Sequence, residues 1–145
     1  MMFELLSQGK RIINVDESWI AETQYAQRMW CPTDAPCTVT DRAISPRLAL
    51  IAALDTDGRV YFSLNHSNTD SDVILLFLRL LVSRLNDDIP SWMQDSIILL
   101  DNAKYHTSKE TREAMLKLQL PIVFSGPYSY SSAPIELMFS GLKNK

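Results

Sequence analysis

Short runs of apolar residues, each closed by a polar one, recur along the chain and predict strands. The run at 10–15 predicts a strand with Asp16 at its end, and the run at 97–100 predicts a second strand that ends at Asp101. A third short strand is expected at 121–126, between Pro and Gly. Two predicted strands therefore end on a carboxylate.

The two segments 47–55 and 59–65 predict a β-hairpin. Its turn has the sequence DTDG, in which Asp57 and Gly58 are expected to supply the positive φ angles of a tight turn. Antiparallel pairing of these two segments follows from the short connection.

Three segments have the apolar spacing and start signals of helices. The first is 69–85, with Thr69 as expected N-cap, and its apolar residues cover most of its circumference, so it should be buried or shared with a partner. The second opens with a capping box of Thr107 and Glu110. The third begins near Pro134, which suits a first helical turn.

The order of these elements predicts the fold class. Strands that alternate with helices imply parallel pairing, and the hairpin adds an antiparallel part, so an α/β fold with a mixed five-stranded sheet flanked by helices is expected. With 145 residues, 1–145 is expected to form a single domain. Residues 17–47 lack periodicity and are expected to form a long insertion.

Composition and charge narrow the class of protein. No apolar run approaches the roughly 20 residues of a membrane span, and the N-terminus does not resemble a secretory signal, so an intracellular protein without membrane contact is expected. Cys31 and Cys37 lack enough companions for a zinc site and are expected to be reduced thiols. The net charge of −3 implies that, if this protein handles nucleic acid, much of its affinity comes from something other than this chain.

Three acidic residues occupy positions that suit a metal site. Asp16 and Asp101 close predicted strands, where ligands gather in parallel sheets, and Glu136 lies in the first turn of the last helix. Glu136 is not part of a capping box, because Ala133 stands where Ser or Thr would be needed. Clustered carboxylates suit two Mg²⁺ or Mn²⁺ ions and phosphoryl transfer on nucleic acid. A purely structural role stays open, since the chain has 17 acidic residues.

The blocks INVDES, LLDNAKYHTS and GPYSYSSAPIELMFSGLK resemble the three signature blocks of mariner-type DDE transposases, which share the ribonuclease H-like fold with retroviral integrases. The resemblance implies that Asp16, Asp101 and Glu136 form a catalytic triad that binds two Mg²⁺ or Mn²⁺ ions. It also matches Asn102 and His106 to supporting positions, and for His106 a structural hydrogen-bonding role stays open.

The same resemblance implies a function and partners. The expected activity is a metal-dependent DDE endonuclease that cleaves DNA at transposon ends and transfers the strand to target DNA, as a homodimer. Segment 17–47 corresponds to a clamp-like insertion, and helix-turn-helix DNA-binding domains upstream are expected to be absent. The expected location is the nucleus in a eukaryote, or the cytoplasm and nucleoid in a bacterium.

The last block departs from the family pattern at Tyr130 and Ala133, where Pro and Asn are common. The geometry ahead of Glu136 is therefore less determined by the resemblance. Two other functions stay open: a domesticated or inactive module that binds DNA or a protein partner, and a ribonuclease H-type nuclease acting on RNA·DNA hybrid.

Overall fold

Five strands form one mixed sheet in the order β3-β2-β1-β4-β5. The computed structural model describes residues 7–20, 48–66, 68–126 and 134–143. The strands are β1 (Arg11–Ile20), β2 (Leu48–Asp55), β3 (Val60–Asn65), β4 (Ser96–Leu100) and β5 (Ile122–Phe124). The helices are α2 (Ser71–Asp88), α3 (Trp92–Asp95), α4 (Lys109–Lys117) and α5 (Pro134–Lys143).

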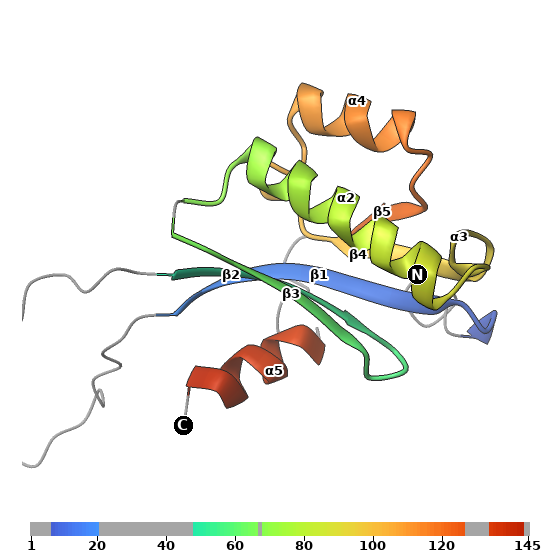
Figure 1. Ribbon diagram of the computed structural model, residues 1–145, viewed down its shortest axis with the longest axis horizontal. Coiled ribbons are helices and arrows are strands. Elements are labelled where there is room, and N and C mark those ends of the chain that lie inside the picture. The colour runs from blue at the N-terminus through green and yellow to red at the C-terminus, as the bar shows by residue number, and fades with distance from the viewer. Residues whose placement is uncertain (1–6, 21–47, 67, 127–133, 144–145) are drawn as a thin grey trace, which may run out of the picture.

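The sheet pairs as the sequence predicts, with an antiparallel half and a parallel half. Strand β2 pairs antiparallel with both β1 and β3, whereas β4 pairs in parallel with β1 and β5. Helices α2 and α4 lie on one side of the sheet and α5 on the other (Figure 1). The expected α/β class with a mixed five-stranded sheet flanked by helices is confirmed. No described helix is long and apolar enough to cross a membrane.

Strand alternation divides the core into two layers. On the α2 side, Ile13 and Val15 of β1 pack with Leu78 and Leu81 of α2. On the α5 side, a smaller cluster joins β2 to α5 through its buried members Leu50, Ala52, Ile135 and Phe139. Burial of these side chains is the main term that holds α5 against the sheet, because a buried Leu, Ile or Phe contributes roughly 1.5–3 kcal/mol.

Strand β1 is longer than the sequence predicts. It continues to Ile20, which pairs with Leu48, so Asp16 lies within the strand opposite Ala52 rather than at its end. The physical reason is that β2 continues to pair with β1 beyond the point where the parallel ladder to β4 stops. Residues 17–20 therefore belong to the sheet and not to the predicted insertion. The remainder of that insertion, 21–47, lies outside the described residues.

Both predicted helix caps are wrong by one residue. Helix α2 is capped by Asp70, whose Oδ1 accepts a hydrogen bond from Val73 N at 3.0 Å, in place of Thr69. Helix α4 is capped by Ser108, whose Oγ accepts from Thr111 N at 3.2 Å. The predicted cap Thr107 instead donates its hydroxyl to Ala103 O, because it still belongs to the preceding turn.

The predicted hairpin is confirmed, although its turn depends on one glycine and one aspartate. Gly58 has a φ of +83°, but Asp57 does not have a positive φ. Asp55 stabilises the turn, since its Oδ1 accepts hydrogen bonds from Asp57 N at 2.9 Å and Arg59 N at 2.8 Å. A carboxylate that binds two backbone amides replaces the second positive-φ residue expected from the sequence.

Candidate active site

The parallel register of β1 and β4 brings two of the predicted site residues to neighbouring positions. Asn14 pairs with Leu99, and two residues further along each strand come Asp16 and Asp101. Both aspartates therefore stand at the same level, at the carboxyl end of the parallel pair. Loops at this edge of a sheet can vary without disturbing the core, which is why ligand sites form there.

Glu136 approaches the same corner from the opposite layer. It lies in the first turn of α5, whose neighbouring residue Ile135 is fully buried against the sheet. The Glu136 side chain is exposed, and its charge is among the causes that raise the pKa of Asp16. Packing of α5 thus brings the third predicted carboxylate within electrostatic reach of the first.

Asp16 resists ionisation. Its pKa is raised to about 6, chiefly by burial and also by the negative charges of Glu17, Glu136 and Asp101, against a lowering hydrogen bond from Glu17 N. A cation placed among these carboxylates would reverse the effect of their mutual repulsion. The electrostatics therefore favour a bound cation at this corner.

His106 joins a carboxylate of β1 to the carboxylate that directly follows β4. Its Nδ1 lies 2.6 Å from Asp101 Oδ1, and its Nε2 lies 2.8 Å from Glu17 Oε1. The ring is completely buried. Tyr105 adds to the group by donating its hydroxyl to Glu17 Oε2 at 3.0 Å. We refer to Asp101, His106 and Glu17 as the carboxylate–histidine bridge.

The bridge holds its histidine as a cation. Burial lowers the pKa of His106, but the hydrogen bonds to Asp101 and Glu17 outweigh it and raise the pKa to about 9. The same contact with His106 lowers the pKa of Asp101, so its carboxylate is ionised at neutral pH. With both ring nitrogens acting as donors, the imidazolium fixes the orientation of Asp101 relative to β1.

Asn102 has a different task from the acidic residues. Its Nδ2 donates to Ser125 O at 2.6 Å, just beyond β5, and Ser125 N in turn donates to Leu100 O. The amide therefore ties the end of β4 to the end of β5. The sequence-predicted Asn102 therefore lies beside the site, where its side-chain amide stabilises the backbone through the hydrogen bond to Ser125 O.

Glu17 is a site residue that sequence reasoning missed. Glu17 directly follows Asp16, but adjacent residues in a strand point to opposite faces of the sheet. Its place in the sequence therefore gave no reason to expect that it shares a site with Asp16. Glu17 belongs to the site because its side chain contacts His106, which is 89 residues away in sequence. Only the sheet register could have indicated it.

The three predicted carboxylates suit a hard cation by their chemistry, although they do not form a closed ligand set. Within the described ranges, no group of three Asp, Glu, His or Cys side chains is close enough together to hold an ion. Among the described residues, the hydrogen bonds to the Asp101 carboxylate go to Oδ1, so Oδ2 is the oxygen on which a cation would bind. Oxygen donors with mutual repulsion are the set that Mg²⁺ and Mn²⁺ prefer.

Solved structures with the same fold include transposases and a viral intasome. A Mos1 transposase paired-end complex with the left transposon end matches with a TM-score of 0.75 and 23% identity, covering 99% of this chain and 44% of that chain. The Mos1 mariner catalytic domain matches with a TM-score of 0.70 and 21% identity, covering 99% of this chain and 63% of that one. The fold is thereby shown to be ribonuclease H-like, as predicted.

The third structure is a simian T-cell lymphotropic virus intasome bound to the PP2A regulatory subunit B56 gamma. It matches with a TM-score of 0.62 and 16% identity, covering 90% of this chain and 37% of that chain. No curated protein matches by sequence. The family model of the DDE superfamily endonucleases matches residues 11–145. That match spans nearly the whole chain, and together with the fold and the position of the carboxylates it establishes that this protein belongs to the DDE superfamily endonucleases.

Proposed function

We propose that this chain is the catalytic part of a transposase, which cleaves DNA at transposon ends and joins the freed end to target DNA. The observation that carries the proposal is the meeting of Asp16 and Asp101 at the carboxyl end of the β1–β4 pair, with Glu136 brought toward them by α5. Support comes from Mos1 structures named as a pre-cleavage transpososome and a strand transfer complex. The chain spans less than half of those longer chains, so DNA recognition and transposition as a whole are part of the proposal.

Asp16, Asp101 and Glu136 would hold two Mg²⁺ or Mn²⁺ ions. Mos1 complexes have been solved with Mn and with Mg, which supports either ion as the partner of this site. When bound, the ions activate a water or a 3′-hydroxyl and stabilise the leaving oxygen of a phosphodiester. Two neighbouring residues would position the metal ligands. His106 orients Asp101, and Asn102 holds the backbone that directly follows Asp101.

The proposal is tested with duplex DNA and RNA·DNA hybrid of one sequence, each incubated with the protein in Mn²⁺. Cleavage of duplex DNA is expected, at a rate reduced about 100-fold or more in Glu136→Gln, because a neutral amide is a weaker ligand for a hard cation. Glu113→Gln is the matched control, since Glu113 is an exposed glutamate of α4 away from the site.

Three results would contradict the proposal. Preferential cleavage of the hybrid would assign a ribonuclease H-type activity. Cleavage that is equal in Glu136→Gln and Glu113→Gln would show that α5 contributes no ligand, and Mn²⁺ binding without any cleavage would favour the inactive, domesticated alternative.

Metal affinity is expected to depend on pH, because a proton and the ion compete for Asp16. With a pKa of about 6 in the absence of metal, this carboxyl is largely protonated at pH 5 and largely ionised at pH 7. The dissociation constant for Mn²⁺, measured by isothermal titration, should fall about tenfold from pH 5 to 7 and change little above pH 7. Asp16→Asn should bind weakly at every pH. An affinity of the natural chain that does not vary with pH would contradict the role of Asp16.

A further inference from the structure

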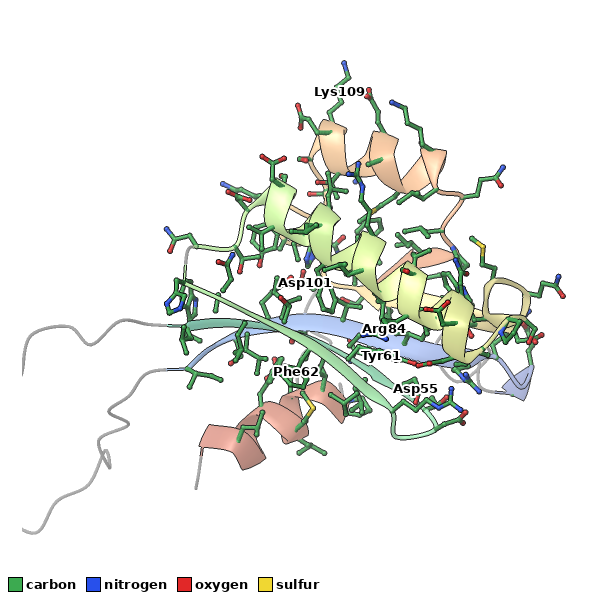
Figure 2. All side chains as sticks on the ribbon, in the orientation of Figure 1. Asp55, Tyr61, Phe62, Arg84, Asp101 and Lys109 are labelled. Atoms are coloured by element: carbon green, nitrogen blue, oxygen red, sulfur yellow. The ribbon has the colours of Figure 1, made fainter. Side chains whose placement is uncertain are left out.

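The two aspartates of the predicted triad lie beyond the end of the β1–β4 ladder. The last paired positions are Asn14 and Leu99, and β4 itself ends at Leu100. Asp101 therefore follows the ladder in a stretch of backbone without regular structure. In Figure 2, Asp101 lies close to the ribbon of β1, although the paired positions have ended. The ladder by itself does not fix how far Asp101 stands from Asp16.

The backbone contacts around the end of β4 lead to β5 and not to β1. Ser125 N donates to Leu100 O at 2.7 Å, and Asn102 Nδ2 donates to Ser125 O at 2.6 Å. Both contacts join the end of β4 to the residue that follows β5. They hold the residues on either side of Asp101, but they do not set its distance from β1. A connection across to β1 is needed for that.

Glu17 makes this connection, because it contacts both aspartates. Its backbone N donates to Asp16 Oδ1 at 2.8 Å. Its side chain reaches Asp101 through His106, with 2.8 Å from Glu17 Oε1 to His106 Nε2 and 2.6 Å from His106 Nδ1 to Asp101 Oδ1. One residue of β1 thus holds both carboxylates, the first directly and the second through a buried ring.

Glu17 is placed to orient metal ligands and not to be one. Ile13 and Val15 of β1 pack toward α2, and alternation puts Glu17 on that same face and Asp16 on the opposite one. Both oxygens of Glu17 are engaged, since Oε1 contacts His106 and Oε2 accepts from the Tyr105 hydroxyl at 3.0 Å. Its side chain is 10% exposed. A carboxylate held in this way serves to position its neighbours.

The other end of the bridge is anchored to two helices. Tyr105 O accepts from Thr111 Oγ1 of α4 at 2.8 Å and from Ser71 Oγ of α2 at 3.4 Å. The Tyr105 ring meets the His106 ring edge-on, with 4.7 Å between the centroids. The loop that carries His106 is therefore held from the helix side, and its distance to the sheet depends on the contact with Glu17.

We propose that Glu17 is a positioning residue of the metal site, which sets the separation of Asp16 and Asp101 so that a pair of divalent ions can bind. The ions of two-metal sites lie about 3.5–4 Å apart, and their ligands must be held to within about 0.5 Å. A rigid ring between two hydrogen bonds suits this task, because it has few internal rotations. The inference rests on the proposed function, since it takes the two aspartates as metal ligands.

The test counts bound Mn²⁺ by isothermal titration in the absence of DNA. The natural chain is expected to bind two ions. Glu17→Ala should bind the second ion about 100-fold more weakly, because Asp101 is no longer tied to β1. Glu17→Gln should keep both ions within about fivefold, since its amide oxygen still accepts from His106. Glu113→Ala removes an exposed glutamate of α4 and should change neither affinity.

Two further measurements separate positioning from a general loss of stability. Val82→Ala removes two methyl groups from a residue of α2 that packs against the core, so it should lower the thermal stability but leave the number of bound ions unchanged. Electron paramagnetic resonance of the Mn²⁺-loaded chain should show two coupled ions in Glu17→Gln and in Val82→Ala, and none in Glu17→Ala. Thermal unfolding shows that each variant is folded at the temperature of the titration.

The inference is refuted by any of three results. One is a natural chain that binds fewer than two ions, and another is a Glu17→Ala variant that binds both as tightly as Glu113→Ala. The third is equal loss of the second ion in Glu17→Ala and Val82→Ala. Full cleavage of duplex DNA by Glu17→Ala with two ions bound would refute this inference and leave the proposed function intact. Loss of the second ion in Glu17→Ala, in a chain whose natural form cleaves no DNA, would support the inference and refute the proposed function.

Discussion

Replacing Asp101 by Asn is expected to lower the rate of DNA cleavage about 10³-fold or more, and to weaken Mn²⁺ binding about 100-fold. Asp101 stands beside Asp16 in the extended register and is ionised at neutral pH because His106 lowers its pKa. The amide keeps the shape and still accepts the hydrogen bonds from Ala103 and His106, but it removes the charge that a divalent ion needs. Rates on duplex DNA and isothermal titration measure the two effects.

Asp95→Asn is the matched control for this prediction, because Asp95 is an exposed aspartate directly before β4. It removes the same charge a few residues away and should change neither rate nor affinity by more than about twofold. A fully active Asp101→Asn would remove Asp101 from the predicted triad. Loss of activity with unchanged Mn²⁺ affinity would assign Asp101 a role other than that of a metal ligand.

Replacing His106 by Ala is expected to reduce the free energy of unfolding by about 3 kcal/mol or more at pH 7 without metal. The buried imidazolium is hydrogen-bonded to Asp101 and Glu17, and its removal leaves two carboxylates facing each other with no cation between them. Removal of one partner from a buried charged group commonly costs about 3–5 kcal/mol. Urea unfolding measures the change.

His66→Ala is the control for the loss of an imidazole, because His66 is exposed and its replacement should cost less than about 0.5 kcal/mol. Glu17→Gln in the His106→Ala background should recover part of the stability, since it removes one of the two opposed charges. A His106→Ala variant as stable as His66→Ala would refute the bridge as a stabilising element.

The contribution of His106 should also vanish at high pH. Its pKa is about 9 in the folded chain and about 6.5 when unfolded, so the folded state holds the proton more tightly. The stabilisation is therefore complete below pH 6.5 and is lost as the pH rises through 9. The stability difference between the natural chain and His106→Ala should shrink over that interval. A difference that grows with pH would contradict the cationic state.

Local pattern was sufficient for most of the fold. The two strand-like segments β2 and β3 with Gly58 between them predicted the hairpin, because tight turns require residues that tolerate positive φ. Apolar spacing located α5, whose Ile135 and Phe139 are buried as the pattern requires. Helix caps were less predictable, since Thr69 and Asp70 both suit an N-cap and only the path of the chain into α2 selects between them.

For three of the site residues, the sequence predicted the chemical role but not the position in the fold. Asp16, Asp101 and Glu136 were predicted from motif blocks and from their place near element ends, which depend on near neighbours in sequence. That Asp16 lies within β1 and not at its end follows from pairing with β2, a segment more than 30 residues away. Pairing between distant segments has no local signal in the chain, so a strand boundary set by it escapes sequence reasoning.

The residue types and their order thus defined the hairpin, the helical faces and the acidic candidates, because turn chemistry and side-chain period act over a few residues. Tertiary packing defined what those acids touch. It placed Glu17 and Asp101 on either side of His106, made the ring a buried cation, and left the outer edge of β3 unpaired within the described chain. These features arise from the register between strands. The register decides which side chains meet, and burial and neighbouring charges then set their pKa values.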